Sequence, residues 1–193
     1  MEGAPEAFGS PYRLLSAAVV PRPIAWVSSR GPRGENLAPF SFFNVAAIDP
    51  PIVMVAPVGV GEDRKDTPEN VLATEAFVVN VVTGDLVEAM NETAATLAPG
   101  ESEFERAGVT AAEATAVDAP RVAEAHVSFE CTLSESMELG GSTLLFGRVV
   151  HAHVDDDLLV DGKLDVTKLD AVGRLAGGYY ASTADRYHLE RPP

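Results

Sequence analysis

Short apolar runs alternate with turn-forming residues along most of the chain. The runs have the length and the branched or aromatic content of β-strands, and they lie at Ile24–Ser29, Ile52–Val58, Phe77–Val82, Val127–Ser134 and Thr143–Asp155. Turn chemistry follows at 30–36, at Gly140-Gly141 and at Asp161-Gly162. Strands joined by such short turns pair antiparallel. The unbroken run Ile52–Val58 predicts a strand buried on both faces, and Gly147 marks an expected irregularity in the last strand.

Three segments have the spacing of helices. Thr67–Thr74 is predicted to start with Thr67 as N-cap and Pro68 at the first helical position. Asp85–Thr96 places Leu86, Met90 and Ala94 on one face, and Glu103–Gly108 is a shorter turn. Leu37–Asn44 is expected to be one extended segment. About six or seven strands with short helices between them predict a mainly β fold, a closed barrel with helical insertions.

The first eleven residues differ in composition from the rest of the chain. Met1–Pro11 is rich in Gly, Pro, Glu and Ala, which predicts a flexible N-terminal arm, and residues 12–193 are predicted to form a single domain. The longest apolar runs are far shorter than the ~20 residues of a membrane span. No basic segment followed by an apolar one marks a secretion signal. We therefore expect a cytoplasmic protein.

Charge and cysteine content narrow the function classes. The net charge is −15, which repels both nucleic-acid phosphate and anionic lipid, so neither nucleic acid nor membrane is an expected partner. The only cysteine, Cys131, excludes an intrachain disulfide and lies in an apolar strand, where a buried and inert thiol is expected. Motifs for a phosphate-binding loop, a nucleophile elbow or a helical zinc site are absent from the sequence.

Two groups of residues could bind a metal ion. Asp155-Asp156-Asp157 ends a strand, and His151 and His153 lie two apart, hence on one face of the same strand. An acidic run is usually solvated, and no third ligand for the two histidines is evident from the sequence. Since a metal site needs a full ligand set, we expect none here.

Two other segments suggest a binding site. Asn36–Asn44 mixes three phenylalanines with polar Ser41 and Asn44, which suits a planar amphipathic ligand and equally suits a core strand with solvent-facing polar positions. Arg64 and Lys65 precede the predicted helix start at Thr67, which suits an anion site, although on general grounds a plain capped helix with surface charges is the commoner arrangement. The chain has only three lysines, Lys65, Lys163 and Lys168. Adjacent cations at a helix start in so acidic a chain favour the anion site.

Taken together, these segments resemble one known family. Pro21–Ser29, Asn36–Asn44, Asp49-Pro50-Pro51, Lys65-Asp66-Thr67 with Phe77–Asn80, and Val172–Leu175 with Gly177–Tyr180 are similar, in order, to flavin-reductase-like proteins of the flavoredoxin type. The similarity runs from about Tyr12 to Ala181, and several motifs in the right order make it specific.

The resemblance implies an FMN-binding split β-barrel of Greek-key type, usually a homodimer that holds FMN (or FAD) near the subunit interface. It implies NADH or NADPH as electron donor, with a partner oxygenase or another electron acceptor. The alternative is an FMN-binding electron carrier or flavin-storage module without NAD(P)H activity. The implied cofactor-binding residues are Ser28, Ser29, Asn36, Ala38, Ser41, Phe42, Phe43, Asn44, Lys65, Asp66 and Thr67. No catalytic side chain is implied, because the redox chemistry belongs to the flavin.

Overall fold

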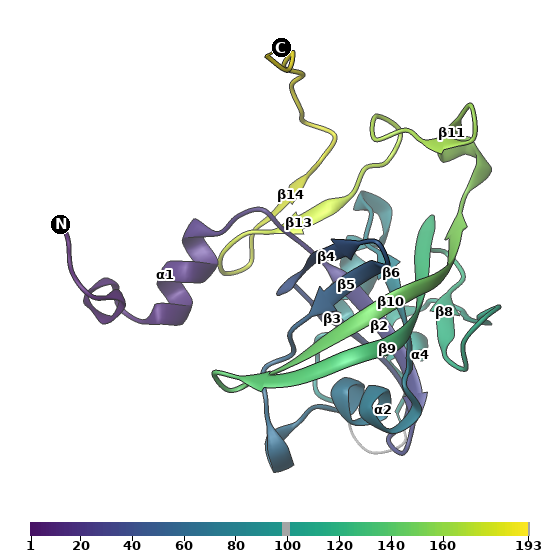
Figure 1. The fold of residues 1–193 in the computed structure, drawn as a ribbon, viewed down its shortest axis with the longest axis horizontal. Coiled ribbons are helices and arrows are strands. Elements are labelled where there is room, and N and C mark those ends of the chain that lie inside the picture. Colours follow the sequence, from purple (N-terminus) through teal and green to yellow (C-terminus); the bar gives the residue numbers. More distant parts are fainter. Residues whose placement is uncertain (98–100, 193) are drawn as a thin grey trace.

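A curled antiparallel sheet of seven strands forms the centre of the molecule in the computed structural model, which describes residues 1–97 and 101–192 (Figure 1). Its strands are β2 Ala25–Gly31, β3 Gly34–Phe40, β4 Phe43–Ile48, β5 Pro51–Val55, β6 Ala76–Val81, β9 Val127–Leu139 and β10 Ser142–Val154. The order across the sheet is β3-β2-β6-β9-β10-β5-β4, with antiparallel neighbours throughout. The prediction of a mainly β, antiparallel fold is confirmed.

The two outer strands of this sheet are joined by only Ser41 and Phe42. β3 ends at Phe40 and β4 begins at Phe43, and three Cα steps span at most about 11 Å. The opposite edges of the sheet therefore approach each other, and the sheet curls into a barrel. The prediction of one extended segment over Leu37–Asn44 is wrong, because the chain bends at these two residues to leave one edge and enter the other.

Smaller elements surround the barrel. The helices are η1 Pro5–Phe8, α1 Pro11–Ala18, η2 Gly61–Asp63, α2 Asp66–Thr74, η3 Gly84–Leu86, α3 Val87–Glu92, α4 Glu103–Ala107 and η4 Asp156–Leu158. The short strands are β1 Arg22–Pro23, β7 Ala111–Glu113, β8 Pro120–Val122, β11 Leu159–Val160, β12 Lys163–Leu164, β13 Val172–Arg174 and β14 Tyr180–Ser182. α1 lies outside the barrel, on the side of β13 and β14 (Figure 1). Among the described helices, none is long and apolar enough to cross a membrane.

The helix predicted over Asp85–Thr96 is shorter than expected. It comprises η3 and α3 and ends at Glu92, and its Leu86 and Met90 are buried as predicted. The Thr93 N–H bonds to the Met90 carbonyl, three residues back, and its hydroxyl accepts the Trp26 indole N–H at 2.9 Å. Thr93 is thereby drawn onto the barrel, so the helix stops and Ala94 is exposed rather than on the buried face.

Apolar residues pack on both faces of the central strands. On β2, Trp26 lies in one cluster with Leu37 and Met90, whereas Val27 on the opposite face packs with Phe77 in the other. Alternate side chains of a strand point to opposite faces, so the centre of β2 is buried at every position. β5 differs from its prediction: only Val53 and Val55 are buried, because it lies next to the edge strand β4 and its other face is half-exposed.

Gly147 and Cys131 occupy neighbouring positions on the barrel interior. The register of β10 against β9 shifts between Phe146 and Gly147, at the predicted irregularity. A side chain at Gly147 would overlap the ring of Phe77. Cys131 lies beside it, and burial raises the pKa of its thiol to about 12. The expectation of a buried cysteine is confirmed, and its low reactivity stays a prediction.

One surface histidine joins the start of β9 to two other segments. His126 Nδ1 lies 2.7 Å from Asp155 at the end of β10, and its Nε2 lies 3.1 Å from Asp85 of η3. The hydrogen bond with Asp155 raises the pKa of His126, and Asp85 adds to the effect.

Candidate functional site

A cavity, called the larger cavity below because a smaller one adjoins it, opens between β3, the start of α2 and the segment after α3. Its volume is about 530 Å³, within the range of small-molecule sites. Apolar walls come from Ala38, Pro39 and Phe40 on one side and from Ala94, Ala95 and Leu97 on the other. The polar lining comprises Arg33, Glu35, Asn36, Lys65, Asp66, Thr67, Thr93, Thr96, Glu101 and Glu103.

The start of α2 forms one end of this cavity. The N-cap is Lys65 rather than the predicted Thr67, and no described side chain caps the helix. Thr67 instead lies in the first turn, where it is buried and donates its hydroxyl to Asn36 Oδ1. Lys65 and the first two residues of α2, Asp66 and Thr67, line the same cavity. A nine-residue helix with an uncapped start and a cation beside it suits an anionic group.

Asn36 links that helix start to α4. Its Oδ1 accepts from Thr67, and its Nδ2 donates to Glu103 of α4 at 3.3 Å. One β3 side chain thus joins α2 to α4 across the cavity wall. Arg33 contributes a second cation, which lies 3.8 Å from Asp66.

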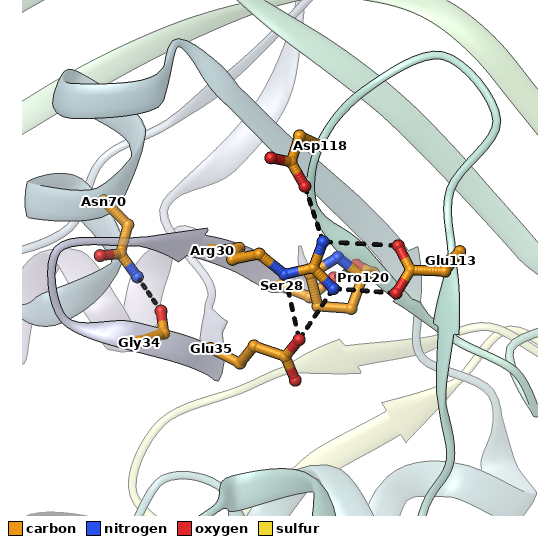
Figure 2. A network of polar contacts seen from close by, with 8 residues as sticks. All are labelled: Ser28, Arg30, Gly34, Glu35, Asn70, Glu113, Asp118 and Pro120. Atoms are coloured by element: carbon orange, nitrogen blue, oxygen red, sulfur yellow. Dashed lines mark hydrogen bonds and ion pairs between the residues drawn. The ribbon is translucent and has the colours of Figure 1, made fainter.

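Asn70 of α2 holds the helix against the β2–β3 hairpin. Its Oδ1 accepts from Arg33 N at 2.9 Å, and its Nδ2 donates to the Gly34 carbonyl at 2.9 Å, as Figure 2 shows, and to Ser29 Oγ at 3.3 Å. The approach is close enough that a Cβ at Gly31 would lie 2.8 Å from Asn70 Oδ1. Sequence reasoning did not identify Asn70 as a positioning residue, although it predicted the helix that carries it.

Arg30, at the end of β2, forms ion pairs with three carboxylates, on the side of the hairpin away from Asn70 (Figure 2). It bonds to Glu35 at 2.8 Å, to Glu113 at 3.0 Å and to Asp118 at 2.6 Å. Glu113, Glu35 and Asp118 hold the pKa of Arg30 above its ordinary value. Ser28 completes the attachment by donating to the Pro120 carbonyl at 2.5 Å. The segment between β7 and β8 is therefore anchored to β2.

The predicted cofactor-binding residues fall into three groups. Asn36, Ala38, Lys65, Asp66 and Thr67 line the larger cavity together. Ser28 and Ser29 are fully buried beside it, where they hold Pro120 and Asn70 respectively. Ser41, Phe42, Phe43 and Asn44 lie outside it.

Those four residues surround the bend between β3 and β4. Phe42 contacts Tyr12, with ring centroids 6.4 Å apart, and the guanidinium of Arg22 lies 5.9 Å from its ring centre. Phe43 packs partly buried against the barrel core, and Asn44 is exposed.

Ser41 lines a second cavity of about 310 Å³, which adjoins the first through the shared walls Pro39 and Ala94. α1 and the β13–β14 hairpin enclose it, and its cations are Arg22 and Arg174. Arg22 is buried and donates to the carbonyls of Ser16, Val19 and Leu175 at 2.5, 2.7 and 2.9 Å.

Arg174 stacks on Tyr180, 4.6 Å from its ring centre, and bonds to the Tyr180 hydroxyl. Both residues belong to the C-terminal motifs of the family resemblance, Val172–Leu175 and Gly177–Tyr180. The structure places them at this second cavity.

The comparisons with known proteins agree with this architecture. Residues 16–168 match the family described as "Flavin reductase like domain". A curated protein of Halalkalibacterium halodurans, BH2278, is 42% identical over 190 residues, covering 94% of this chain and 90% of that protein.

Solved structures give the same result. Nitrilotriacetate monooxygenase component B from Bacillus cereus has a TM-score of 0.89 and 37% identity, covering 97% of this chain and 95% of its own. The 2-nitrobenzoate 2-nitroreductase NbaA of Pseudomonas fluorescens has a TM-score of 0.89 and 31% identity, and the match covers 100% of this chain and 96% of NbaA. The predicted split barrel is confirmed, since it is the fold of the flavin reductases that this structure resembles. The chain therefore belongs to the flavin reductase like family.

Proposed function

We propose that this protein binds FMN in the larger cavity and reduces it with NADH or NADPH, so that electrons pass to an acceptor or a partner oxygenase. The observation that carries the proposal is the pairing of an uncapped helix start and Lys65 with facing apolar walls in one cavity of about 530 Å³. An aromatic ring system with a phosphate tail needs both features.

The residues present fit such a cofactor. The phosphate is expected at the first-turn N–H groups of α2, where Lys65 adds a charge-assisted hydrogen bond. Ala38 and Pro39 on one side and Ala94 on the other offer apolar surface to the ring. Asn36 and Asn70 act indirectly, since they hold α2 and the hairpin in place. A bound flavin supplies the redox chemistry, accepting a hydride from a nicotinamide and passing electrons on.

The second cavity is the place for the electron donor in this proposal. It shares Pro39 and Ala94 with the first cavity, so the two cavities adjoin, and hydride transfer requires the two rings to meet in direct contact where the cavities join. Arg22 and Arg174 give it positive charge in a chain of net charge −15, which suits a phosphorylated nucleotide. The name of the Bacillus cereus neighbour, a monooxygenase component, supports an oxygenase as the acceptor.

A second copy of the chain is the proposed partner at the β4 edge. Val45 and Ile48 on β4 are 59% and 79% exposed, and Tyr12 and Leu15 of α1 are 66% and 56% exposed. Apolar side chains gathered on one side of a molecule mark an interaction surface. Phe42 and Asn44, implied ligand residues outside the larger cavity, lie at this same edge. Sedimentation velocity tests this: Ile48→Glu should weaken a dimer that Val160→Glu, at another exposed apolar position, leaves intact.

The proposed reductase activity is tested with the purified protein and its own flavin. Released flavin is identified by chromatography, which distinguishes FMN from FAD. The loaded protein is then mixed anaerobically with NADH or NADPH while the flavin absorbance is followed. Bleaching with either nucleotide supports the reductase. A flavin that stays oxidised with both, yet is reduced by dithionite, contradicts it and favours the electron carrier or storage module.

A further inference from the structure

A cluster of two histidines and a glutamate lies on the outer face of the barrel, on β9 and β10. Glu130 of β9 is directly opposite His151 of β10, and His153 lies one step further along the same face. The side-chain ligand atoms of these three residues all lie within 4.8 Å of one another. The two imidazole rings meet edge to face, with centroids 4.9 Å apart.

A bulge in β10 creates this arrangement. Val149 pairs with Cys131 on the inner face, and the register then shifts so that His151, not Val150, pairs with Glu130. In a regular strand, Val149 and His151 would point to the same side. The extra residue turns His151 and His153 to the outer face, where Glu130 lies. Bulges that redirect side chains in this way are common next to functional sites.

Glu130 is a fully buried carboxylate held from several directions. Oε1 accepts from Thr115 N at 2.7 Å, and Oε2 accepts from Ala116 N at 2.5 Å. Oε1 also lies 2.5 Å from His153 Nε2. These amide donors fix the carboxylate in one orientation, as the outer hydrogen bonds of a metal ligand do. His151 and His153 are only partly buried, so solvent reaches the cluster from their side.

From this geometry we propose that Glu130, His151 and His153 form a binding site for a divalent transition metal ion, with Zn²⁺ as the reference ion. Two imidazoles and one carboxylate are a set that zinc uses, with water as fourth ligand. Ligand distances of about 2.1 Å in a tetrahedral site separate the ligand atoms by about 3.4 Å. The 2.5 Å contact and the 4.8 Å upper limit on the ligand-atom separations lie on either side of that value.

The bound ion would tie β9 and β10 to the segment between β7 and β8. That segment bonds to Glu130 through Thr115 and Ala116, and its Asp118, together with Glu113 at the end of β7, bonds to Arg30 at the β2–β3 hairpin. The metal site is thus linked through one segment to the hairpin beside the larger cavity. It does not depend on the flavin, so it can be tested in protein from which flavin has been removed.

His151 is the residue that separates this proposal from its simplest alternative. A hydrogen-bonded Glu130–His153 pair without a metal needs no contribution from His151. The test compares wild type, His151→Ala and His188→Ala, after chelator treatment and dialysis. His188 is an exposed histidine in the C-terminal tail and serves as the matched control. Zn²⁺ binding is measured by calorimetry, and Co²⁺ is added separately to record the visible spectrum of tetrahedral cobalt.

Wild type and His188→Ala are expected to bind about one Zn²⁺ per chain and to show tetrahedral Co²⁺ bands. His151→Ala should lose the bands and bind Zn²⁺ at least about 100-fold more weakly, since even loss of an outer-shell partner costs 10- to 100-fold. Circular dichroism checks that the variant is folded, and Glu130→Gln provides a second ligand variant. Absence of stoichiometric binding in wild type, or equal affinity in His151→Ala and His188→Ala, would overturn the proposal.

Discussion

Replacing Asn70 by alanine should destabilise the protein and loosen the cavity together. The change removes three hydrogen bonds at once: those with Arg33 N, the Gly34 carbonyl and Ser29 Oγ. Ser29 is fully buried, so its hydroxyl loses a partner that water cannot replace, at a cost of about 1–3 kcal/mol. The two hairpin groups lie at an exposed turn and cost about 0.5–1 kcal/mol each. The expected total is about 2–5 kcal/mol.

Urea unfolding followed by circular dichroism measures this loss. With an m-value of about 2 kcal/mol/M, the midpoint should fall by about 1–2.5 M at unchanged m. Glu88→Ala, at an exposed position on α3, is the control and should change stability by less than about 0.5 kcal/mol. FMN affinity should fall in Asn70→Ala as well, since α2 loses its attachment to the hairpin. An unfolding free energy equal to that of the control would refute the assignment of Asn70 as the positioning residue.

Three further experiments test the fold. Gly147→Ala should cost about 1–3 kcal/mol in urea unfolding, because its Cβ overlaps the ring of Phe77; a neutral change would show that the barrel relaxes there. The raised pKa of His126 means that its contribution is complete below its unfolded pKa of about 6.5 and is lost as pH rises through the folded value. His126→Asn should therefore lower stability at pH 6 by up to about 1 kcal/mol and hardly at all at pH 9, and a pH-independent difference contradicts this. Cys131 should react with a disulfide reagent at pH 8 only after unfolding, since burial raises its pKa to about 12; fast labelling of the native protein would contradict its burial.

The strands were predictable because their signals are local. Apolar runs of strand length, with turn residues between them, located the main strands of the sheet. The irregularity at Gly147 was also predictable from the sequence, since a glycine inside a strand often marks a bulge or a site where another group approaches the backbone closely.

The bend at Ser41 and Phe42 was not predictable in this way. It exists because β3 pairs with β2 while β4 pairs with β5 at the other end of the sheet. Strand partners are determined by contacts between distant parts of the chain. The local pattern of alternating residues continues through the bend, so the pattern does not indicate where the chain changes its partner strand.

The candidate site, like the fold, was predictable from the sequence only in part. Asn36, Lys65 and Thr67 were identified because motif order links them, and the structure gathers them at one cavity. Glu103 and the segment after α3 carry no local signal for binding, and only the folded chain brings them to that wall. The histidine pair was visible in the sequence, but its third ligand lies more than twenty residues away on the paired strand. The N-cap was misplaced by two residues because Thr67 bonds to Asn36 and not to its own helix.

The central claim is that the start of α2 and Lys65 hold the phosphate of FMN. The most direct measurement is a fluorescence titration of flavin-free wild type, Lys65→Ala and the control Lys163→Ala with FMN and with riboflavin, at low and high salt. The Kd for FMN should rise about 10- to 100-fold in Lys65→Ala and remain unchanged in Lys163→Ala. The Kd for riboflavin, which has no phosphate, should be the same in all three, and high salt should narrow the FMN difference. Equal FMN affinity in wild type and Lys65→Ala would contradict the account.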